Sequence, residues 1–211
     1  REELKDAGAD WIIHSPDQLS AIVTGTALLP RGQGALAAEL LRMGRLAAVP
    51  TETVYGLAAD ATLDSAVQAV YEAKGRPEQK PLSVLVDGMD MVEAVCRDIR
   101  SDAYKLAQAF WPGPLTMVLR RKRVVPDVVT AGLDTVGMRC PAHPVCRAIL
   151  AAADVPVAAP SGNTSGRPSP TTAAGMLEDM DGKIDGIVDG GPCAVGVEST
   201  IVDLTVMPPR L

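Results

Sequence analysis

The chain has 211 residues, which is enough for one sizeable domain or two small ones. Hydrophobic residues make up 47% of it and aromatic residues only 3%, so the sequence predicts a core of aliphatic side chains. The net charge of −6 argues against a protein that binds nucleic acid over its whole surface, and no apolar run approaches the roughly 20 residues of a membrane span. The four cysteines form no C-x-x-C pair, which favours reduced thiols and a cytoplasmic location.

Residues 1–33 are predicted to be a lead-in that ends in a stretch rich in glycine and proline, and residues 34–211 are predicted to be one domain. Apolar residues at helical spacing predict helices over residues 36–43, 64–71, 101–110, 143–153 and 171–180. Short apolar runs predict strands over residues 46–49, 82–86, 115–119, 135–139, 155–159, 186–188 and 197–204. Asp64 is expected to cap its helix. Because strands and helices alternate, and some strands follow each other closely, the predicted fold class is α/β with a mixed sheet.

A first polar block, P-T-E-T-V-Y-G-L at residues 50–57, follows a predicted strand. Its two hydroxyls and its carboxylate leave the strand end together, where open α/β sheets place their ligands. The same residue types are also typical of a capping turn. The block taken alone leaves both interpretations open.

A second block places Lys74, Arg76 and Lys80 between a predicted helix and a predicted strand. Pro77 and Pro81 stiffen this segment, so the three cations are presented by a restrained loop. Arginine offers bidentate contacts to phosphate and lysine a point charge, which suits a polyphosphate ligand. The alternative is an ordinary solvated loop.

A third block ends a predicted strand with Arg139, which predicts a carboxylate partner, either an internal acid or a ligand, because a buried unpaired arginine is costly. A fourth block, A-P-S-G-N-T-S-G-R-P-S-P-T at residues 159–171, offers hydroxyls and backbone N–H groups to a phosphate or nucleotide. It lacks the Walker A spacing, and its alternative is a surface loop. Near the end, E-S-T at residues 198–200 lies in an apolar run and needs polar partners.

Two other site classes are not favoured. Cys140, His143 and Cys146 provide three zinc-type ligands without an evident fourth, so no metal site is predicted. Ser161 lacks the G-x-S-x-G context of a hydrolase nucleophile, and neither histidine of the chain lies in a recognisable triad.

Taken together and in order, five blocks between residues 36 and 205 resemble the YrdC-like family, whose enzymes act as threonylcarbamoyl-AMP synthases. The blocks are P-T-E-T-V-Y-G-L-A-A-D-A, K-G-R-P-E-Q-K-P-L-S-V-L-V, F-W-P-G-P-L-T-M-V-L, T-V-G-M-R-C-P-A-H-P with A-P-S-G-N-T-S-G-R-P-S-P-T, and V-G-V-E-S-T-I-V-D-L-T. The resemblance implies that residues 34–211 are a YrdC-like catalytic domain. It also implies a twisted mixed sheet flanked by helices around a large concave basic cavity.

The resemblance further implies a role for each matching position. The family's K-x-R and S-x-N signature falls on Lys74, Arg76, Ser161 and Asn163, of which Lys74 and Arg76 are assigned to catalysis. The positions that resemble ATP contacts are Arg76, Lys80, Thr135, Ser161, Asn163 and Ser169. The positions that resemble threonine contacts are Thr53, Arg139, Ala159 and Ser199, and Arg139 is expected to pair with the threonine carboxylate.

The implied substrates are L-threonine, bicarbonate and ATP, with Mg²⁺, and the implied product passes to a downstream threonylcarbamoyl transferase complex that modifies tRNA. One alternative is a module that binds double-stranded RNA or tRNA without catalysis, although a net acidic chain with cations clustered in its loops favours a small polyanion. Another is a carbamoyl-adenylate-forming domain of a carbamoyltransferase, which would use carbamoyl phosphate.

The chain departs from the family pattern in two places. Leu85 stands where many relatives have a histidine that contacts substrate. Many relatives also carry an arginine that contacts ATP in an R-P-G block just beyond the point where this sequence reaches Leu211. Longer relatives add a second domain after that point.

Overall fold

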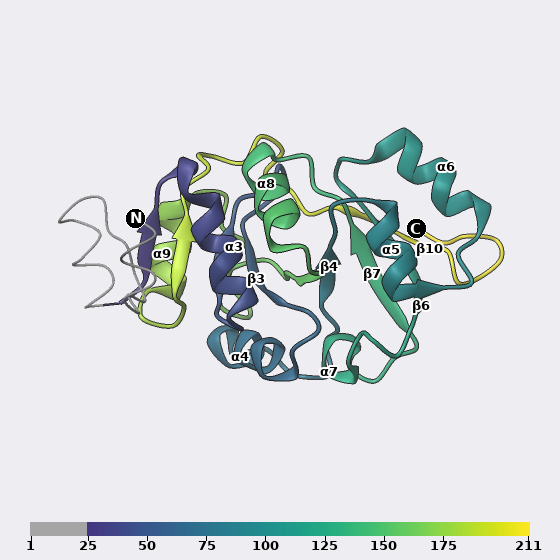
Figure 1. Cartoon of the computed structure of the whole chain (residues 1–211), viewed down its shortest axis with the longest axis horizontal. Helices are drawn as coiled ribbons and strands as arrows, with labels where there is room; N and C mark the ends of the chain where they lie inside the picture. Colours follow the sequence, from purple (N-terminus) through teal and green to yellow (C-terminus); the bar gives the residue numbers. More distant parts are fainter. Residues whose placement is uncertain (1–24) are drawn as a thin grey trace, which may run out of the picture.

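The computed structural model describes residues 25–211, so most of the predicted lead-in lies outside the described residues. Ten strands of this part of the chain form one sheet in the order β1-β9-β2-β3-β8-β4-β7-β6-β10, and β5 pairs with β6 (Figure 1). The strands on the amino-terminal side of the sheet are β1 (Ala27–Leu29), β2 (Ala47–Val49), β3 (Gly56–Asp60), β8 (Val157–Ala158) and β9 (Gly186–Val188). The remaining strands are β4 (Ser83–Leu85), β5 (Cys96–Arg97), β6 (Leu115–Arg121), β7 (Thr135–Arg139) and β10 (Thr200–Asp203).

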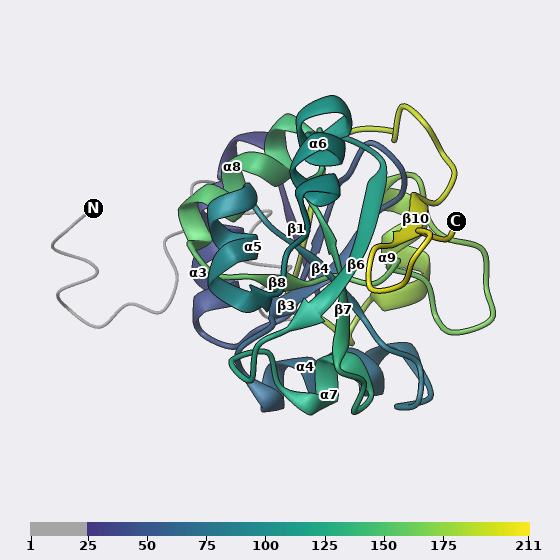
Figure 2. The same cartoon turned by 90° about the vertical axis from the view of Figure 1, so that its right-hand side faces the viewer.

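Helices pack on both faces of this sheet. The longer ones are α3 (Gly34–Arg42), α4 (Asp64–Lys74), α6 (Ser101–Phe110), α8 (Pro144–Ala153) and α9 (Ala173–Met180). The shorter ones are the 3₁₀ helix η1 (Arg31–Gln33), α5 (Met89–Val95) and α7 (Asp127–Thr130). In the view along the sheet, α3 and α8 lie on one side of the strands and α9 on the other (Figure 2). Within the described residues, no helix is both long enough and apolar enough to cross a bilayer.

The sheet is mixed, as predicted. β4 and β7 are parallel, whereas β6 and β7 are antiparallel, and β8 runs antiparallel to both of its neighbours, β3 and β4. Because side chains alternate between the two faces of a strand, this register decides which residues share a face. The twisted mixed sheet flanked by helices confirms the predicted fold class.

One sheet face is divided into two halves of different character. Its apolar half packs under α3 and α8, which also pack against each other. The strand residues of the apolar half are Ala27, Leu29, Ala47, Val49, Ala58, Leu85, Val157 and Val188, and Ala159 directly follows β8. Its polar half lies further along the same face, on β4, β6 and β7. The residues of the polar half are Ser83, Thr116, Thr135, Gly137 and Arg139.

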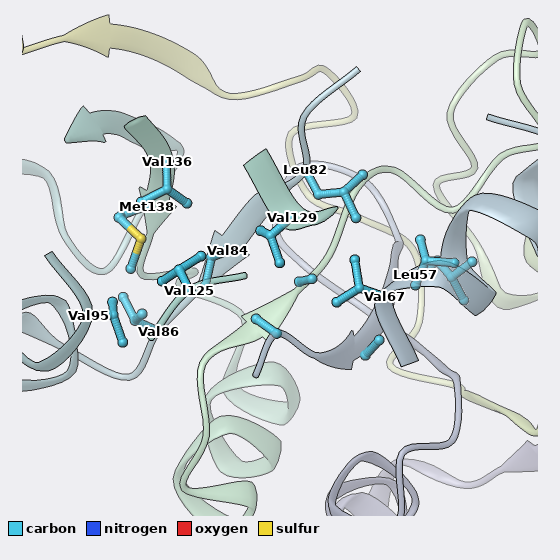
Figure 3. Close-up of a cluster of buried hydrophobic side chains, with 14 of the residues drawn as sticks. Leu57, Val67, Leu82, Val84, Val86, Val95, Val125, Val129, Val136 and Met138 are labelled. Carbon is cyan, nitrogen blue, oxygen red and sulfur yellow. The ribbon is translucent and has the colours of Figure 1, made fainter. Parts of the chain in front are cut away.

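The opposite face holds the larger hydrophobic cluster, which is almost wholly aliphatic as the composition predicts (Figure 3). Helices α4 to α7 and α9 all contribute to it. Its labelled members in Figure 3 are Leu57, Val67, Leu82, Val84, Val86, Val95, Val125, Val129, Val136 and Met138. Burying a side chain of this size contributes about 1.5–3 kcal/mol, so this cluster is the principal hydrophobic contribution to the stability of the sheet.

Most predicted elements are confirmed, and α6, β7 and β9 have the predicted bounds. β3 lies partly in a block predicted as a polar loop, yet all five of its residues are buried and it occupies the middle of the sheet. β1 belongs to the predicted lead-in but pairs in parallel with β9. The prediction that Asp64 caps its helix is wrong, because Asp64 is the first residue of α4 and the preceding Leu63 occupies the cap position without a side-chain hydrogen bond.

Candidate active site

The polar half of the sheet face is built by strand register. Gly137 pairs with Ser83 of β4 on one side and with Val118 of β6 on the other. A methyl group added at Gly137 would lie 3.2 Å from Thr116 Cγ2 and 3.6 Å from Ser83 Oγ, so these three residues are close neighbours on the face. Thr135 and Arg139 point to the same face from the two ends of β7, about 13 Å apart at the strand rise of roughly 3.3 Å per residue.

Arg139 ends β7 and is only 6% exposed. Its Nη2 donates to Glu52 Oε1 at 2.7 Å, its Nη1 donates to Thr53 Oγ1 at 2.9 Å, and its Nε donates to the carbonyl oxygen of Gly113 at 3.3 Å. The other carboxylate oxygen, Glu52 Oε2, accepts the backbone N–H of Ala142 at 2.9 Å. A guanidinium has five N–H donors, so these three bonds leave two of them for a ligand.

The hydroxyl of Thr53, which is bonded to Arg139, has defined donor and acceptor roles. Thr53 is fully buried, and its Oγ1 lies 3.0 Å from Thr51 Oγ1. The hydroxyl of Thr51 donates to the carbonyl of Val54 at 2.7 Å, so the proton between the two threonines belongs to Thr53. Thr53 Oγ1 therefore accepts from Arg139 and donates to Thr51, and it keeps one lone pair for a further donor.

Lys74 ends α4 and is 1% exposed. Its Nζ donates to the carbonyl of Asn163 at 2.5 Å and also to the carbonyl of Ser161. Burial in the first place, and the charge of Arg76 in the second, lower the pKa of this amine to about 8. Lys74 thus ties the end of α4 to the loop that follows β8, and its predicted role at the phosphates stays a prediction.

The loop of residues 161–170 is closed by its own polar groups. Ser161 Oγ donates to Asn163 Oδ1 at 2.7 Å, and Asn163 Nδ2 donates to the carbonyl of Arg167 at 2.7 Å. Ser169 Oγ donates to Glu198 Oε1 at 2.6 Å and lies 3.5 Å from Asn163 Oδ1. The predicted residues Lys74, Ser161, Asn163 and Ser169 therefore form one connected group.

Ala159 and Ser199 border the polar half. The N–H of Ala159 donates to the carbonyl of Ser83 at 2.9 Å, and Ala159 retains 9% exposure at the boundary between the two halves. Ser199 Oγ lies 2.7 Å from the hydroxyl of Thr116, which is 2% exposed. These contacts place Ala159 beside β4 and Ser199 beside β6, the two neighbours of the strand that carries Arg139.

Arg76 and Lys80 belong to the same restrained loop. Arg76 donates from Nε to the carbonyl of Lys80 at 3.2 Å and from Nη2 to that of Pro81 at 3.0 Å. Lys80 itself is exposed. Thr135 is half-buried, and within residues 25–211 its hydroxyl makes no hydrogen bond to another predicted site residue. In the described part of the chain, hydrogen bonds thus join the predicted residues into three groups, which are Arg139 with Thr53, Lys74 with the loop residues Ser161, Asn163 and Ser169, and Arg76 with Lys80. Ala159 and Ser199 bond to Ser83 and Thr116 instead, and Thr135 is separate.

Two residues at the site were given no role from the sequence. Glu52 supplies the internal carboxylate that the strand-end arginine predicted, and it lies in a block where the sequence already placed a carboxylate next to hydroxyls. Thr116 lies on β6 in a block that offered no signal beyond strand periodicity, because its role depends on register with β7 and on contact with Ser199.

The described residues form no cluster of three or more histidine, cysteine or acidic side chains that could hold a metal ion. Cys140 is buried beside the carbonyl of Asp87, and burial raises the pKa of the Cys146 thiol to about 12. Burial also raises the pKa of the Cys140 thiol, so both thiols favour the protonated form over the thiolate that binds metals.

Fold and site together define an α/β domain with a polar sheet face, in which a buried arginine and several loop hydroxyls leave unused hydrogen-bonding capacity for a small polar ligand. Residues 39–211 match the Sua5/YciO/YrdC family, described as telomere recombination. The chain belongs to this family.

Two curated relatives have the same printed name, threonylcarbamoyl-AMP synthase. The one from Pyrococcus abyssi is 49% identical over 176 residues, which cover 83% of this chain and 52% of the relative. The one from Bacillus subtilis is 45% identical over 196 residues, which cover 91% of this chain and 54% of the relative. The chain thus spans about half the length of these relatives. The crystal structure of P. abyssi Sua5 complexed with L-threonine is similar with a TM-score of 0.85 and 46% identity, covering 87% of this chain and 56% of that one.

Proposed function

We propose that this domain is a threonylcarbamoyl-AMP synthase, which forms L-threonylcarbamoyladenylate and pyrophosphate from L-threonine, bicarbonate and ATP. The names of the relatives at 45% and 49% identity support this assignment, as does the similarity to a structure bound to L-threonine. The observation that carries it is Arg139, a nearly buried arginine with two N–H donors left for a ligand beside the unused lone pair of Thr53.

The amino-acid half of the proposed site consists of Thr53, Arg139, Ala159 and Ser199. Arg139 would bind the threonine carboxylate, because two N–H donors match the two oxygens of a carboxylate. Thr53 Oγ1 would accept an N–H of the substrate, since its own proton is directed to Thr51. In this proposal the two residues, which are already bonded to each other, recognise opposite ends of one amino acid.

The nucleotide half of the proposed site consists of Arg76, Lys80, Thr135, Ser161, Asn163 and Ser169. The exposed amine of Lys80 would contact the phosphates, and Arg76 would add a second cation from the same restrained loop. The part proposed for Lys74 in catalysis is to hold residues 161–163 through two carbonyl groups. A concave basic cavity over this face remains part of the proposal.

The proposed reaction needs no protein nucleophile. The threonine amine and bicarbonate form a carbamate with loss of water, and a carbamate oxygen then bonds to the α-phosphorus of ATP while the bond to the β-phosphate breaks and pyrophosphate leaves. The chain's own residues would hold the reactants in line and neutralise charge. In this proposal ATP is bound together with a magnesium ion. Such an ion would supply further charge neutralisation.

The proposal extends to the surroundings of the enzyme. We propose a cytoplasmic protein whose product, an activated mixed anhydride, is consumed by a threonylcarbamoyl transferase complex acting on tRNA. Direct binding of tRNA or double-stranded RNA by this domain would need a local basic surface, because the net charge of the whole chain is −6.

Pyrophosphate release from ATP and bicarbonate, with and without L-threonine, tests the assignment on the wild type and on Lys80→Ala. We expect release that depends on threonine, and a rise of about tenfold in KM for ATP in the variant. Lys105→Ala, which removes an exposed lysine from α6, is the matched control and should leave KM unchanged. Release that depends on carbamoyl phosphate would instead indicate the carbamoyl-adenylate activity. Salt-sensitive RNA binding without any release would indicate a binding module.

A further inference from the structure

Glu52 is held by bonds at both of its carboxylate oxygens. Oε1 accepts from Arg139 at 2.7 Å and Oε2 accepts from the backbone N–H of Ala142 at 2.9 Å. Both charged side chains are nearly buried, with 11% of the Glu52 side chain and 7% of the Arg139 side chain exposed. The backbone bond anchors the carboxylate to the turn after β7, so the carboxylate is a fixed point against which the guanidinium is oriented.

The three acceptors around Arg139 come from two other segments of the chain. Glu52 and Thr53 precede β3, Gly113 precedes β6, and Arg139 itself ends β7. Of the three acceptors only Glu52 is charged, and within the described residues it is the ion-pair partner that compensates the charge of the arginine. Removing one member of a buried ion pair leaves the other charge unpaired, which is strongly unfavourable. Without Glu52, the arginine side chain would turn toward water and away from its present orientation.

We propose that Glu52 is a positioning residue, which orients the guanidinium of Arg139 so that its two unused N–H groups receive the carboxylate of the amino-acid substrate. This inference rests on the proposed function for the identity of the substrate. It assigns to Glu52 no contact with the reacting atoms. Its effect on threonine binding should therefore pass entirely through Arg139.

A double-mutant cycle separates this role from a general structural one. The variants are Glu52→Gln, Arg139→Gln and the pair of substitutions together, with threonine binding measured by calorimetry and KM measured separately for threonine and ATP. Glu93→Gln, which makes the same chemical change at an exposed glutamate bonded to Tyr104, is the matched control. Glutamine keeps one acceptor oxygen but presents an NH₂ group where Glu52 has its second acceptor.

We expect Glu52→Gln to weaken threonine binding by about tenfold or more, by analogy with residues that orient metal-binding side chains. The KM for ATP should stay unchanged. In the Arg139→Gln background, the further change at Glu52 should have no additional effect on threonine binding. The double variant should also recover part of the loss in Tm, because no buried charge is left unpaired.

Threonine binding that is unchanged in Glu52→Gln would overturn the inference. So would an equal loss in the Arg139→Gln background, since Glu52 would then act on the substrate itself. If Glu52→Gln does not fold, Glu52→Asp retains the charge but shortens the side chain, and it should still weaken threonine binding.

The orientation of Arg139 can also be followed without ligand, through the NMR signal of its Nε–H group. We expect a sharp signal in the wild type and a broadened one in Glu52→Gln. A wild type that binds no threonine would argue against the proposed function, whereas a signal unchanged by the substitution would argue against the positioning role. The two failures are therefore distinguishable.

Discussion

The two halves of one sheet face differ in what covers them and in what they contain. The apolar half carries aliphatic residues such as Val157 and is buried by α3 and α8. The polar half carries hydroxyls, a glycine and Arg139, and Ser83 and Thr135 remain half-buried. The same strand, β4, contributes Ser83 to one half and Leu85 to the other. The difference shows that the candidate site lies where helix packing on this face ends.

Leu85 illustrates how closely the halves adjoin. It pairs with Arg139 on one side and with Val157 on the other, and it is 3% exposed within the apolar half. The resemblance implied that a substrate contact made by a histidine in many relatives is lost or replaced at this position. In the structure the side chain packs with the cluster under α8, so the position extends the apolar half toward Arg139.

The largest expected effect is a loss of stability caused by a substitution in the apolar half alone. Ile149→Ala removes a side chain of α8 that is 1% exposed, and it should lower the free energy of unfolding by about 2–5 kcal/mol. Threonine affinity of the folded protein should stay within twofold of the wild type. Urea unfolding and calorimetry measure the two quantities. Arg147→Ala on the same helix is the control, since its partly exposed pair with Asp87 contributes at most about 1 kcal/mol. If the free energy of threonine binding fell by as much as the free energy of unfolding, the two halves would be coupled.

An intermediate effect concerns the charge of Lys74. Its pKa is about 8 in the folded protein because of burial, whereas a lysine in an unfolded chain titrates near 10.4. Below pH 8 both states are protonated and the cost of burying the charge is fully present. Between pH 8 and about 10.4 the unfolded chain binds more protons, so the contribution of Lys74 to stability rises with pH, by up to about 3 kcal/mol.

Urea unfolding at pH 7.5 and 9.5 gives the free energy of unfolding of the wild type and of Lys74→Met, which has no amine to titrate at this position. The free energy of the wild type should rise relative to that of the variant between the two pH values. The difference is needed because Cys96 and Cys146, whose thiol pKa values are raised to about 12 by burial, act in the opposite direction over the same range. Lys105→Met, at an exposed position, should behave as the wild type. A difference between the wild type and Lys74→Met that does not change with pH would contradict the prediction.

The smallest expected effect comes from a substitution at the edge of the polar half, where Thr116 contacts Ser199. Thr116→Val removes the hydroxyl that lies 2.7 Å from Ser199 Oγ, and it should lower the free energy of unfolding by about 1 kcal/mol. Threonine affinity should fall a few-fold, because Ser199 loses the group that holds it beside β6. Thr116→Ser keeps the hydroxyl and should retain both properties. If the serine variant lost as much affinity as the valine variant, the methyl group and not the hydroxyl would be responsible.

Local patterns predicted much of the fold and failed for identifiable reasons. α6 and β7 have clear periodicity and sharp ends, and their bounds were predicted correctly. β3 was missed because the run G-L-A-A-D contains small residues with little strand propensity, and its burial comes from tertiary contacts with β2 and β8 in the sheet and with the helices α3 and α4. α5 and α7 are short, with seven and four residues, and carry too little periodicity to be recognised.

The sequence by itself determined the aliphatic core, the α/β class and the polar blocks at strand ends, because each of these depends on residues close together in the chain. Only the tertiary structure decided that Glu52 is the partner of Arg139, since the two lie 87 residues apart and meet through the sheet. It likewise decided that Lys74 bonds to the carbonyl of Asn163, 89 residues away. A buried charge requires a partner, but the order of strands in the sheet selects which one.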